Sequence, residues 1–286
     1  MATTATATSV TRTPLPPPVK RPGGIIRWIR EHIIQIAAAA ALFYMFLPIF
    51  VVVIFSFNDP VGRYNDKWVQ FSTDAWTDFC GVAGMCDSLK LSIIIALLAT
   101  AATVILGTLT AFAISRYRFR GRSSGNLLIF MPMATPEVVM GSSLLALFVT
   151  LGIPRGTSTI LIAHIMFCLS FVVVTVKARL ASLDSRLEQA AMDLYANERT
   201  TFWRITFPLV LPGIVAAALL AFSLSFDDFI VTNFVSETTV TFPIFVWGAA
   251  QRGTPPQINV VGSLMFLISL AIILIGQVIS SRRKKV

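Results

Sequence analysis

Three carboxylates lie inside long apolar runs of the chain. Glu137 lies about ten residues into one run, and Asp227 and Asp228 lie towards the end of another. A charged side chain at the centre of a bilayer costs about 2.5–3.5 kcal/mol and marks a candidate functional site facing a cavity or a partner. Since no Lys or Arg lies deep in these runs, the three acids favour a path for a cationic solute. The alternatives are a hydrogen-bonded structural acid at Glu137 and a water-facing pair at the two aspartates.

The residues around these acids predict irregular helices. Pro136 directly precedes Glu137, and its missing backbone donor predicts a kink where that carboxylate points. Adjacent helical residues point about 100° apart, so Asp227 and Asp228 are not expected to share one face. We expect one of them to face the cavity, while the other caps or pairs with a neighbouring helix.

Other candidate catalytic residues give weaker signals. His164 stands alone in an apolar run and is expected to be a hydrogen-bonded core residue, and Cys168 is expected in the core as well. An intramembrane hydrolase that uses Ser142 or Ser143 with His164 is an unfavoured alternative. The chain has two histidines and no Cys/His cluster, which predicts no metal site. Since it also lacks the G-x-x-x-x-G-K-[ST] phosphate loop, no catalytic residue is assigned and no ATP binding is expected.

Residues 58–88 form the longest segment between apolar runs on the predicted outer side. Trp68 and Trp76 stand there among several aspartates, which fits either an interfacial aromatic belt or an outer vestibule for a cation. Cys80 and Cys86 fall in the same segment, outside the reducing cytosol, so a disulfide between them is a further candidate feature.

The elements that must position these residues are membrane helices. The 286 residues are 55% hydrophobic and 13% charged, against about 25% charged in soluble domains. Six runs reach the span length of about 20 residues, near Ile33–Phe57, Leu89–Ser115, Leu127–Leu151, Ser158–Val176, Phe207–Thr232 and Val260–Ser280. The sequence therefore predicts an all-α integral membrane protein, with residues 1–24 as a disordered cytoplasmic tail and residues 25–286 as one six-helix domain.

Basic residues orient the predicted spans. With both termini in the cytosol, 18 of the 23 Lys and Arg residues lie on the cytoplasmic side, as the positive-inside rule requires. This distribution also explains the net charge of +9 without nucleic-acid binding, which would need basic residues clustered on a folded soluble face.

Residues 183–206 predict a cytoplasmic helical hairpin. Ser185-x-x-Glu188 has the spacing of a capping box that begins a helix, and an apolar face with Ala190 and Ala191 at its centre follows. A second helix is expected to start after Asn197 and to lead into the fifth span. Such a face favours either close docking of a partner or an amphipathic helix that lies on the bilayer.

The same hairpin resembles the EAA loop of ABC importer permeases. The pattern falls on Gln189, Ala190, Ala191, Tyr195, Ile205, Phe207 and Pro208. Gln189 replaces the acid, although Glu188 stands next to it, Tyr195 replaces a glycine and Phe207 replaces a leucine. If the glycine turn is kept, either Tyr195 is strained or Asn197 takes the left-handed conformation.

Four further segments, Arg116–Gly121, Pro136–Met140, His164–Val176 and Phe222–Asp228, are similar to the spermidine/putrescine branch of these permeases. The resemblance implies the type I importer permease fold, with a hairpin that inserts into a separate ATPase and couples to it. It implies partners: ABC ATPase subunits that bind ATP and Mg, a second permease that is a different chain, and an external substrate-binding protein. It implies import of spermidine or putrescine; an amino-acid derivative or a sugar is the alternative cargo. A stand-alone channel is disfavoured because it needs no docking hairpin. The coupling residues are Glu188, Gln189, Ala190, Ala191, Asp193, Tyr195, Ala196, Asn197, Ile205 and Pro208.

Overall fold

The computed structural model describes the backbone of residues 24–283 and the side chains of residues 32–276. The predicted disordered tail, residues 1–24, lies outside the described residues except for Gly24. The chain divides into two compact units, Met1–Val51 and Val52–Val286, which are described separately.

The described part of the first unit is a single long helix. Helix α1 spans Gly24–Phe55, and its last four residues belong to the second unit. Its segment His32–Phe55 has a mean hydropathy of 2.6, which agrees with the first predicted span. Apolar side chains such as Ile34, Phe43 and Tyr44 are exposed around it, as expected for a helix that is covered by lipid or by other proteins.

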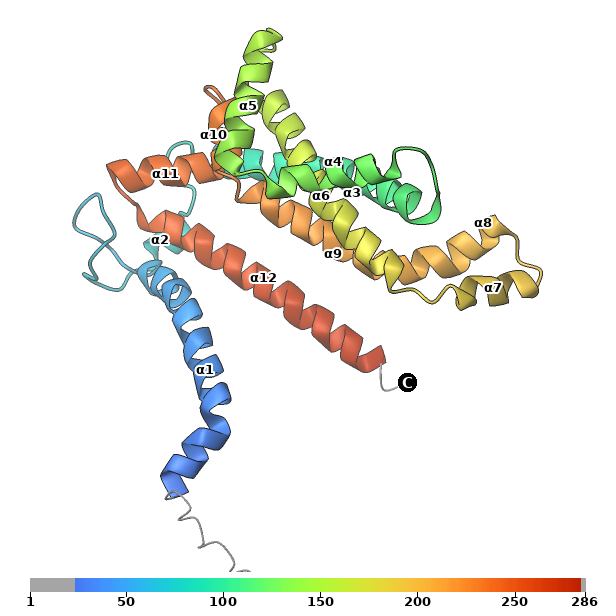
Figure 1. Cartoon of the computed structure of the whole chain (residues 1–286). Helices are drawn as coiled ribbons and strands as arrows, with labels where there is room; N and C mark the ends of the chain where they lie inside the picture. The colour runs from blue at the N-terminus through green and yellow to red at the C-terminus, as the bar shows by residue number, and fades with distance from the viewer. Residues whose placement is uncertain (1–23, 284–286) are drawn as a thin grey trace, which may run out of the picture. The chain divides into compact units, whose positions relative to one another are not determined.

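Three long helices form the core of the second unit. Helices α3 (Met85–Arg116), α6 (Thr157–Ala181) and α9 (Phe207–Phe226) pack side by side (Figure 1). Small residues allow this close approach: a side chain at Gly107 of α3 would lie 2.6 Å from Val172, and one at Gly213 of α9 would lie 2.5 Å from Arg179. Interfaces rich in small residues are typical of helix packing in membranes.

The predicted third span is broken into two helices. Helix α4 covers Arg122–Ala134 and α5 covers Glu137–Thr150, with a bend of 107° between them. The break falls at Thr135 and Pro136, where the residue before a proline disfavours helical backbone. The predicted kink at Pro136 is therefore confirmed in position, and its angle of 107° divides the predicted span into two separate helices.

The predicted fifth span is also shifted. A continuous helical path runs from Glu198 to Phe226, and after a break α10 covers Ile230–Val235. The expected end at Thr232 is wrong because α9 ends at Phe226, and the chain continues as α10, which packs against α5. A side chain at Gly141 of α5 would lie 2.6 Å from Phe234 of α10.

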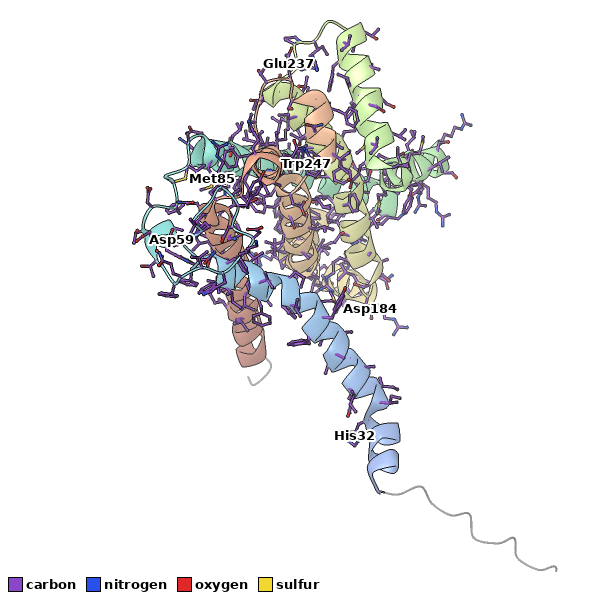
Figure 2. All side chains as sticks on the ribbon, turned by 90° about the vertical axis from the view of Figure 1, so that its left-hand side faces the viewer. His32, Asp59, Met85, Asp184, Glu237 and Trp247 are labelled. Atoms are coloured by element: carbon purple, nitrogen blue, oxygen red, sulfur yellow. A yellow bond between two sulfur atoms is a disulfide. The ribbon has the colours of Figure 1, made fainter. Side chains whose placement is uncertain are left out.

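The remaining helices complete the second unit. Helix α2 (Asp74–Thr77) lies in the outer segment, and α11 (Phe242–Arg252) precedes α12 (Pro256–Arg283). A second apolar cluster contains Met85, Phe242, Ile258 and Val261. Figure 2 shows Glu237 near the top of this unit, well above Asp184. Five helices within the described residues are long and apolar enough to cross a membrane, or six when the bent pair counts as one span.

Candidate functional site

The hairpin after α6 consists of two short helices. Helix α7 covers Arg186–Asp193, and α8 covers Glu198–Thr201 and continues through a π-helix, η1, at Phe202–Thr206. The predicted restart after Asn197 is confirmed, because the Asn197 side chain accepts a hydrogen bond of 2.8 Å from the Thr200 backbone. Asparagine is a favoured residue at this capping position.

The predicted capping box at Ser185 is wrong. The Ser185 side chain makes no capping bond, and Asp184 instead accepts a hydrogen bond of 2.9 Å from the Arg186 backbone. Glu188 does not reach back to the helix start, because its carboxylate has a charged partner elsewhere.

Tyr195 adopts the left-handed conformation of the glycine that it replaces. Its φ is +64°, while Asn197 has an extended backbone with φ −77°. The Ala196 backbone donates to Ala191 and the Tyr195 backbone to Met192, which is the Schellman pattern that ends a helix. Of the two alternatives, the strained tyrosine is the one found, and its side chain is fully exposed.

Glu188 joins the hairpin to two membrane helices. Its carboxylate accepts hydrogen bonds from both terminal nitrogens of Arg116, the last residue of α3. It also accepts a hydrogen bond of 2.6 Å from the Thr206 hydroxyl. The hydrogen bond from Arg116 lowers the pKa of Glu188 from its usual value, against the opposing effect of partial burial. Glu188 is therefore ionised at neutral pH. Sequence reasoning missed this role of Arg116 and Thr206, since nothing in the spacing connects residues 72 positions apart.

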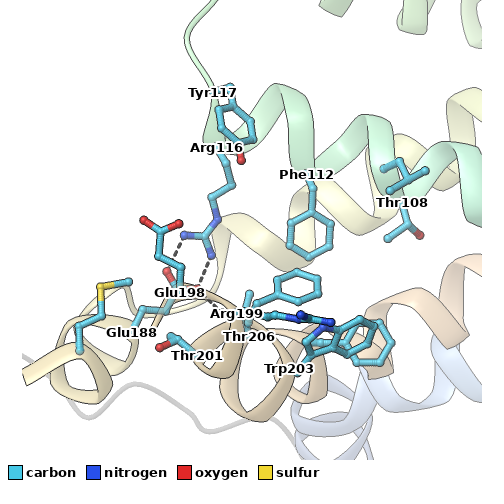
Figure 3. A pocket seen from close by; sticks show the side chains of 14 residues that line it. Thr108, Phe112, Arg116, Tyr117, Glu188, Glu198, Arg199, Thr201, Trp203 and Thr206 are labelled. Carbon is cyan, nitrogen blue, oxygen red and sulfur yellow. Dashed lines mark hydrogen bonds and ion pairs between the residues drawn. The ribbon is translucent and has the colours of Figure 1, made fainter. Parts of the chain in front are cut away.

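An open groove of about 790 Å³ lies beside this contact. Figure 3 shows Arg116, Phe112 and Trp203 around it, with dashed lines between Arg116 and its carboxylate partner. Phe112 of α3 meets Phe202 of η1 edge to face, with ring centroids 5.5 Å apart. Aromatic side chains and charged side chains both line the groove, which lies between the end of α3 and the start of the fifth span.

The predicted coupling residues are divided between two environments. Ala191 is buried, and Glu188, Ala196 and Ile205 are partly buried. The others are exposed, as is Leu194 with 81% of its surface accessible. The apolar face expected from the sequence is therefore split, because Ala191 turns inward while Leu194 and Tyr195 point to solvent. The exposed coupling residues are Gln189, Ala190, Asp193, Tyr195, Asn197 and Pro208.

The three acids of the apolar runs have different surroundings. Glu137 is the first residue of α5, directly after the break, and is exposed. Asp227 directly follows α9 and is exposed, whereas Asp228 is buried. The expectation that the two aspartates differ is confirmed. Asp228 is the one that caps and pairs, so it is not available to a solute in this structure.

Asp228 belongs to a buried polar network with His164. The Asp228 carboxylate accepts hydrogen bonds from the Thr232 backbone N–H at 2.8 Å and from the Thr232 hydroxyl at 2.7 Å. It also lies 3.3 Å from Nε2 of His164. The other ring nitrogen of His164 lies 2.7 Å from the Ser225 hydroxyl. His164 is therefore a hydrogen-bonded core residue, as predicted, and Cys168 is buried too.

The hydrolase alternative finds no support in this geometry. Both ring nitrogens of His164 contact Ser225 and Thr232, not Ser142 or Ser143. The Ser142 hydroxyl donates to the Val139 carbonyl at 3.1 Å. A serine nucleophile needs a base within hydrogen-bond distance. His164, the proposed base, makes its described hydrogen bonds to other residues and to neither of these two serines.

The outer segment is folded on itself. Cys80 and Cys86 form a disulfide, and Asn58 pairs with Phe71 in an antiparallel bridge. Trp76 stacks on Phe57 at 5.2 Å and donates to the Ser56 hydroxyl, so it serves packing of the segment. Trp68 remains about half exposed and is the better candidate for an outer vestibule.

Solved structures identify the class of fold. A bacterial ABC transporter involved in the import of the acidic polysaccharide alginate matches with a TM-score of 0.61 at 18% identity, covering 92% of this chain and 99% of that one. A bacterial alginate ABC transporter in complex with an alginate pentasaccharide-bound periplasmic protein matches with a TM-score of 0.63 at 14% identity, covering 90% and 96%. The fold is that of an ABC importer permease.

Sequence comparison identifies the family. Residues 103–285 match the binding-protein-dependent transport system inner membrane component, and the chain belongs to this family. The spermidine/putrescine transport system permease protein PotC of Haemophilus influenzae is 37% identical over 84% of this chain and 93% of its own length. The putrescine transport system permease protein PotI of Escherichia coli is 37% identical over 78% and 81%. The chain is thus a multi-pass membrane permease subunit and not an enzyme.

Proposed function

We propose that this chain forms, with a second and different permease, the path by which spermidine or putrescine enters the cell. The observation that carries the proposal is its similarity, over most of its length, to permease proteins named for spermidine and putrescine transport. The solved importers named for alginate share less than 25% identity and support the fold alone.

The charges along the helix breaks support a cationic cargo. Glu137 follows the break before α5, and Asp227 precedes the break before α10. Helices α5 and α10 pack against each other, so each break adjoins one helix of this packed pair. Within residues 32–276 no ion pair involves either acid, which leaves Glu137 and Asp227 as candidate contacts for an ammonium group.

The partners follow from the two ends of the permease. The exposed hairpin residues Leu194 and Tyr195 would enter a groove of an ATPase subunit, of which two are expected, and ATP and Mg would bind there and not to this chain. A substrate-binding protein would deliver the cargo to the outer segment near Trp68. Both termini would lie in the cytosol, as the distribution of basic residues favours.

The test is transport by the assembled complex in proteoliposomes. The wild-type complex should take up labelled spermidine in the presence of ATP, and excess putrescine should compete whereas an amino acid or a sugar should not. Glu137→Gln should reduce substrate-stimulated ATP hydrolysis and uptake by about tenfold, the effect of losing one interaction of about 1.4 kcal/mol, without preventing assembly.

Glu237→Gln is the matched control, because Glu237 is an exposed acid paired with Arg155 at 3.4 Å and is not placed in the path. Unchanged stimulation in Glu137→Gln would remove that residue from the path. Competition by a sugar or an amino-acid derivative in place of putrescine would assign the alternative cargo.

A further inference from the structure

Glu188 is the side chain that connects α7 to the packed helices. Its carboxylate accepts hydrogen bonds from Arg116, the last residue of α3, and from Thr206, the last residue of η1. Since η1 continues into α9, this single group connects the hairpin to two of the three core helices. Thr206 is buried, so the contact reaches into the packed region.

The tip of the hairpin has a different character. Leu194 is 81% exposed and Tyr195 fully exposed, and both lie at the turn between α7 and α8. Gln189, the residue next to Glu188, is also exposed. A partner that grips the hairpin would meet these side chains first, whereas Glu188 faces its own chain.

The exposure and geometry of the Arg116–Glu188 ion pair indicate its role. The side chains of Arg116 and Glu188 are 39% and 17% exposed, and ion pairs near the surface contribute little to stability. A paired guanidinium and carboxylate nevertheless fix direction, because two parallel hydrogen bonds allow one relative orientation. The pair therefore determines orientation more than it adds stability.

The surroundings leave room for movement. The groove of about 790 Å³ borders Arg116 and Glu188, so the hairpin is not packed tightly on that side. The π-helix η1 carries Thr206, and such turns are frequent at functional sites in helices.

We propose that Glu188 is a positioning residue that transmits displacement of the hairpin to α3 and α9, and that it is not itself a contact for the ATPase. The proposal rests on the proposed function. It separates two adjacent residues of the loop: Gln189 faces the partner, and Glu188 faces the membrane helices.

The experiment measures ATP hydrolysis and spermidine uptake in the same proteoliposomes containing the complete complex. In Glu188→Gln and in Arg116→Gln, uptake per ATP hydrolysed should fall about fivefold or more, the lower range of coupling between sites, while the ATPase still co-purifies. The exchange Arg116→Glu with Glu188→Arg should restore most of the loss. Glu237→Gln, which breaks another exposed Arg–Glu pair, should leave the ratio unchanged.

A second variant guards against misfolding. Thr206→Val keeps the ion pair and removes only the hydroxyl contact, and it should give a smaller loss of uptake per ATP at an unchanged melting temperature. The proposal is overturned if Glu188→Gln keeps the wild-type ratio, if it abolishes ATPase binding, or if the exchanged pair is as impaired as the single variants. A wild-type complex that binds no ATPase or takes up no polyamine would instead contradict the proposed function.

Discussion

The two helix breaks of this permease are made in different ways. The break before α5 contains Pro136, and its acid, Glu137, stays exposed. The break before α10 contains no proline, and its acid, Asp228, is buried under hydrogen bonds from Thr232. Both breaks are followed by a short helix, and these helices pack together.

The difference shows that an acid in an apolar run has two uses. Proline interrupts a helix through its own backbone, so the carboxylate beside it is not needed for structure. Without proline, a capping side chain must satisfy the free backbone donors of the new helix, and Asp228 performs that function. We therefore expect stability to depend on the second break and transport on the first.

The largest effect on stability is expected from Asp228→Ala. The substitution removes the cap of α10 and leaves His164 and Thr232 without their partner, which should lower the free energy of unfolding by about 3 kcal/mol. Unfolding in mixed micelles of mild detergent and dodecyl sulfate measures this change. Asp227→Ala is the control and should cost less than about 0.5 kcal/mol; equal losses in both variants would contradict the distinction between the aspartates.

A smaller effect is expected at the hairpin, where Tyr195 ends α7 at φ +64°. Tyr195→Gly removes the clash of a β-carbon in the left-handed conformation and should raise the melting temperature by about 2–4 °C. Tyr195→Ala keeps the β-carbon and should give no gain. A similar rise in both variants would show that the bulky exposed ring, and not the backbone, is the source of strain.

The smallest effect is expected at the first break. Because Glu137 is exposed, Glu137→Gln should change the free energy of unfolding by less than about 0.5 kcal/mol, even though transport falls. The same micelle assay applies. A loss near that of Asp228→Ala would mean that Glu137 is a structural acid as well, and the contrast between the breaks would disappear.

The pH dependence of stability tests a further carboxylate, Glu188. Its folded pKa lies below the usual 4.5 because Arg116 donates to it, so its stabilising contribution is complete above that value. The contribution is lost as the pH falls through the lowered folded pKa. Thermal unfolding as a function of pH should therefore show a small acid-dependent loss that Glu188→Gln reduces, and identical profiles would contradict the pair.

Local signals predicted much of this fold. Apolar run length identified the membrane helices, Pro136 located the first break, and Asn197 marked the start of α8. The residue pattern of the hairpin was sufficient to recognise the family that the comparisons confirm. Each of these signals depends on neighbours within a few positions, where helix geometry makes the sequence directly readable.

Contacts between distant segments were not predictable in this way. The sequence left open which aspartate caps a helix, and it gave Glu188 a capping partner within its own turn. Only the tertiary packing brings Arg116 to Glu188 and His164 to Asp228. The sequence alone determined where most of the helices form, because helix formation depends on neighbouring residues. The tertiary structure decided where the fifth span ends and which polar groups are held in hydrogen bonds and ion pairs, because these depend on contacts between residues 61 to 72 positions apart.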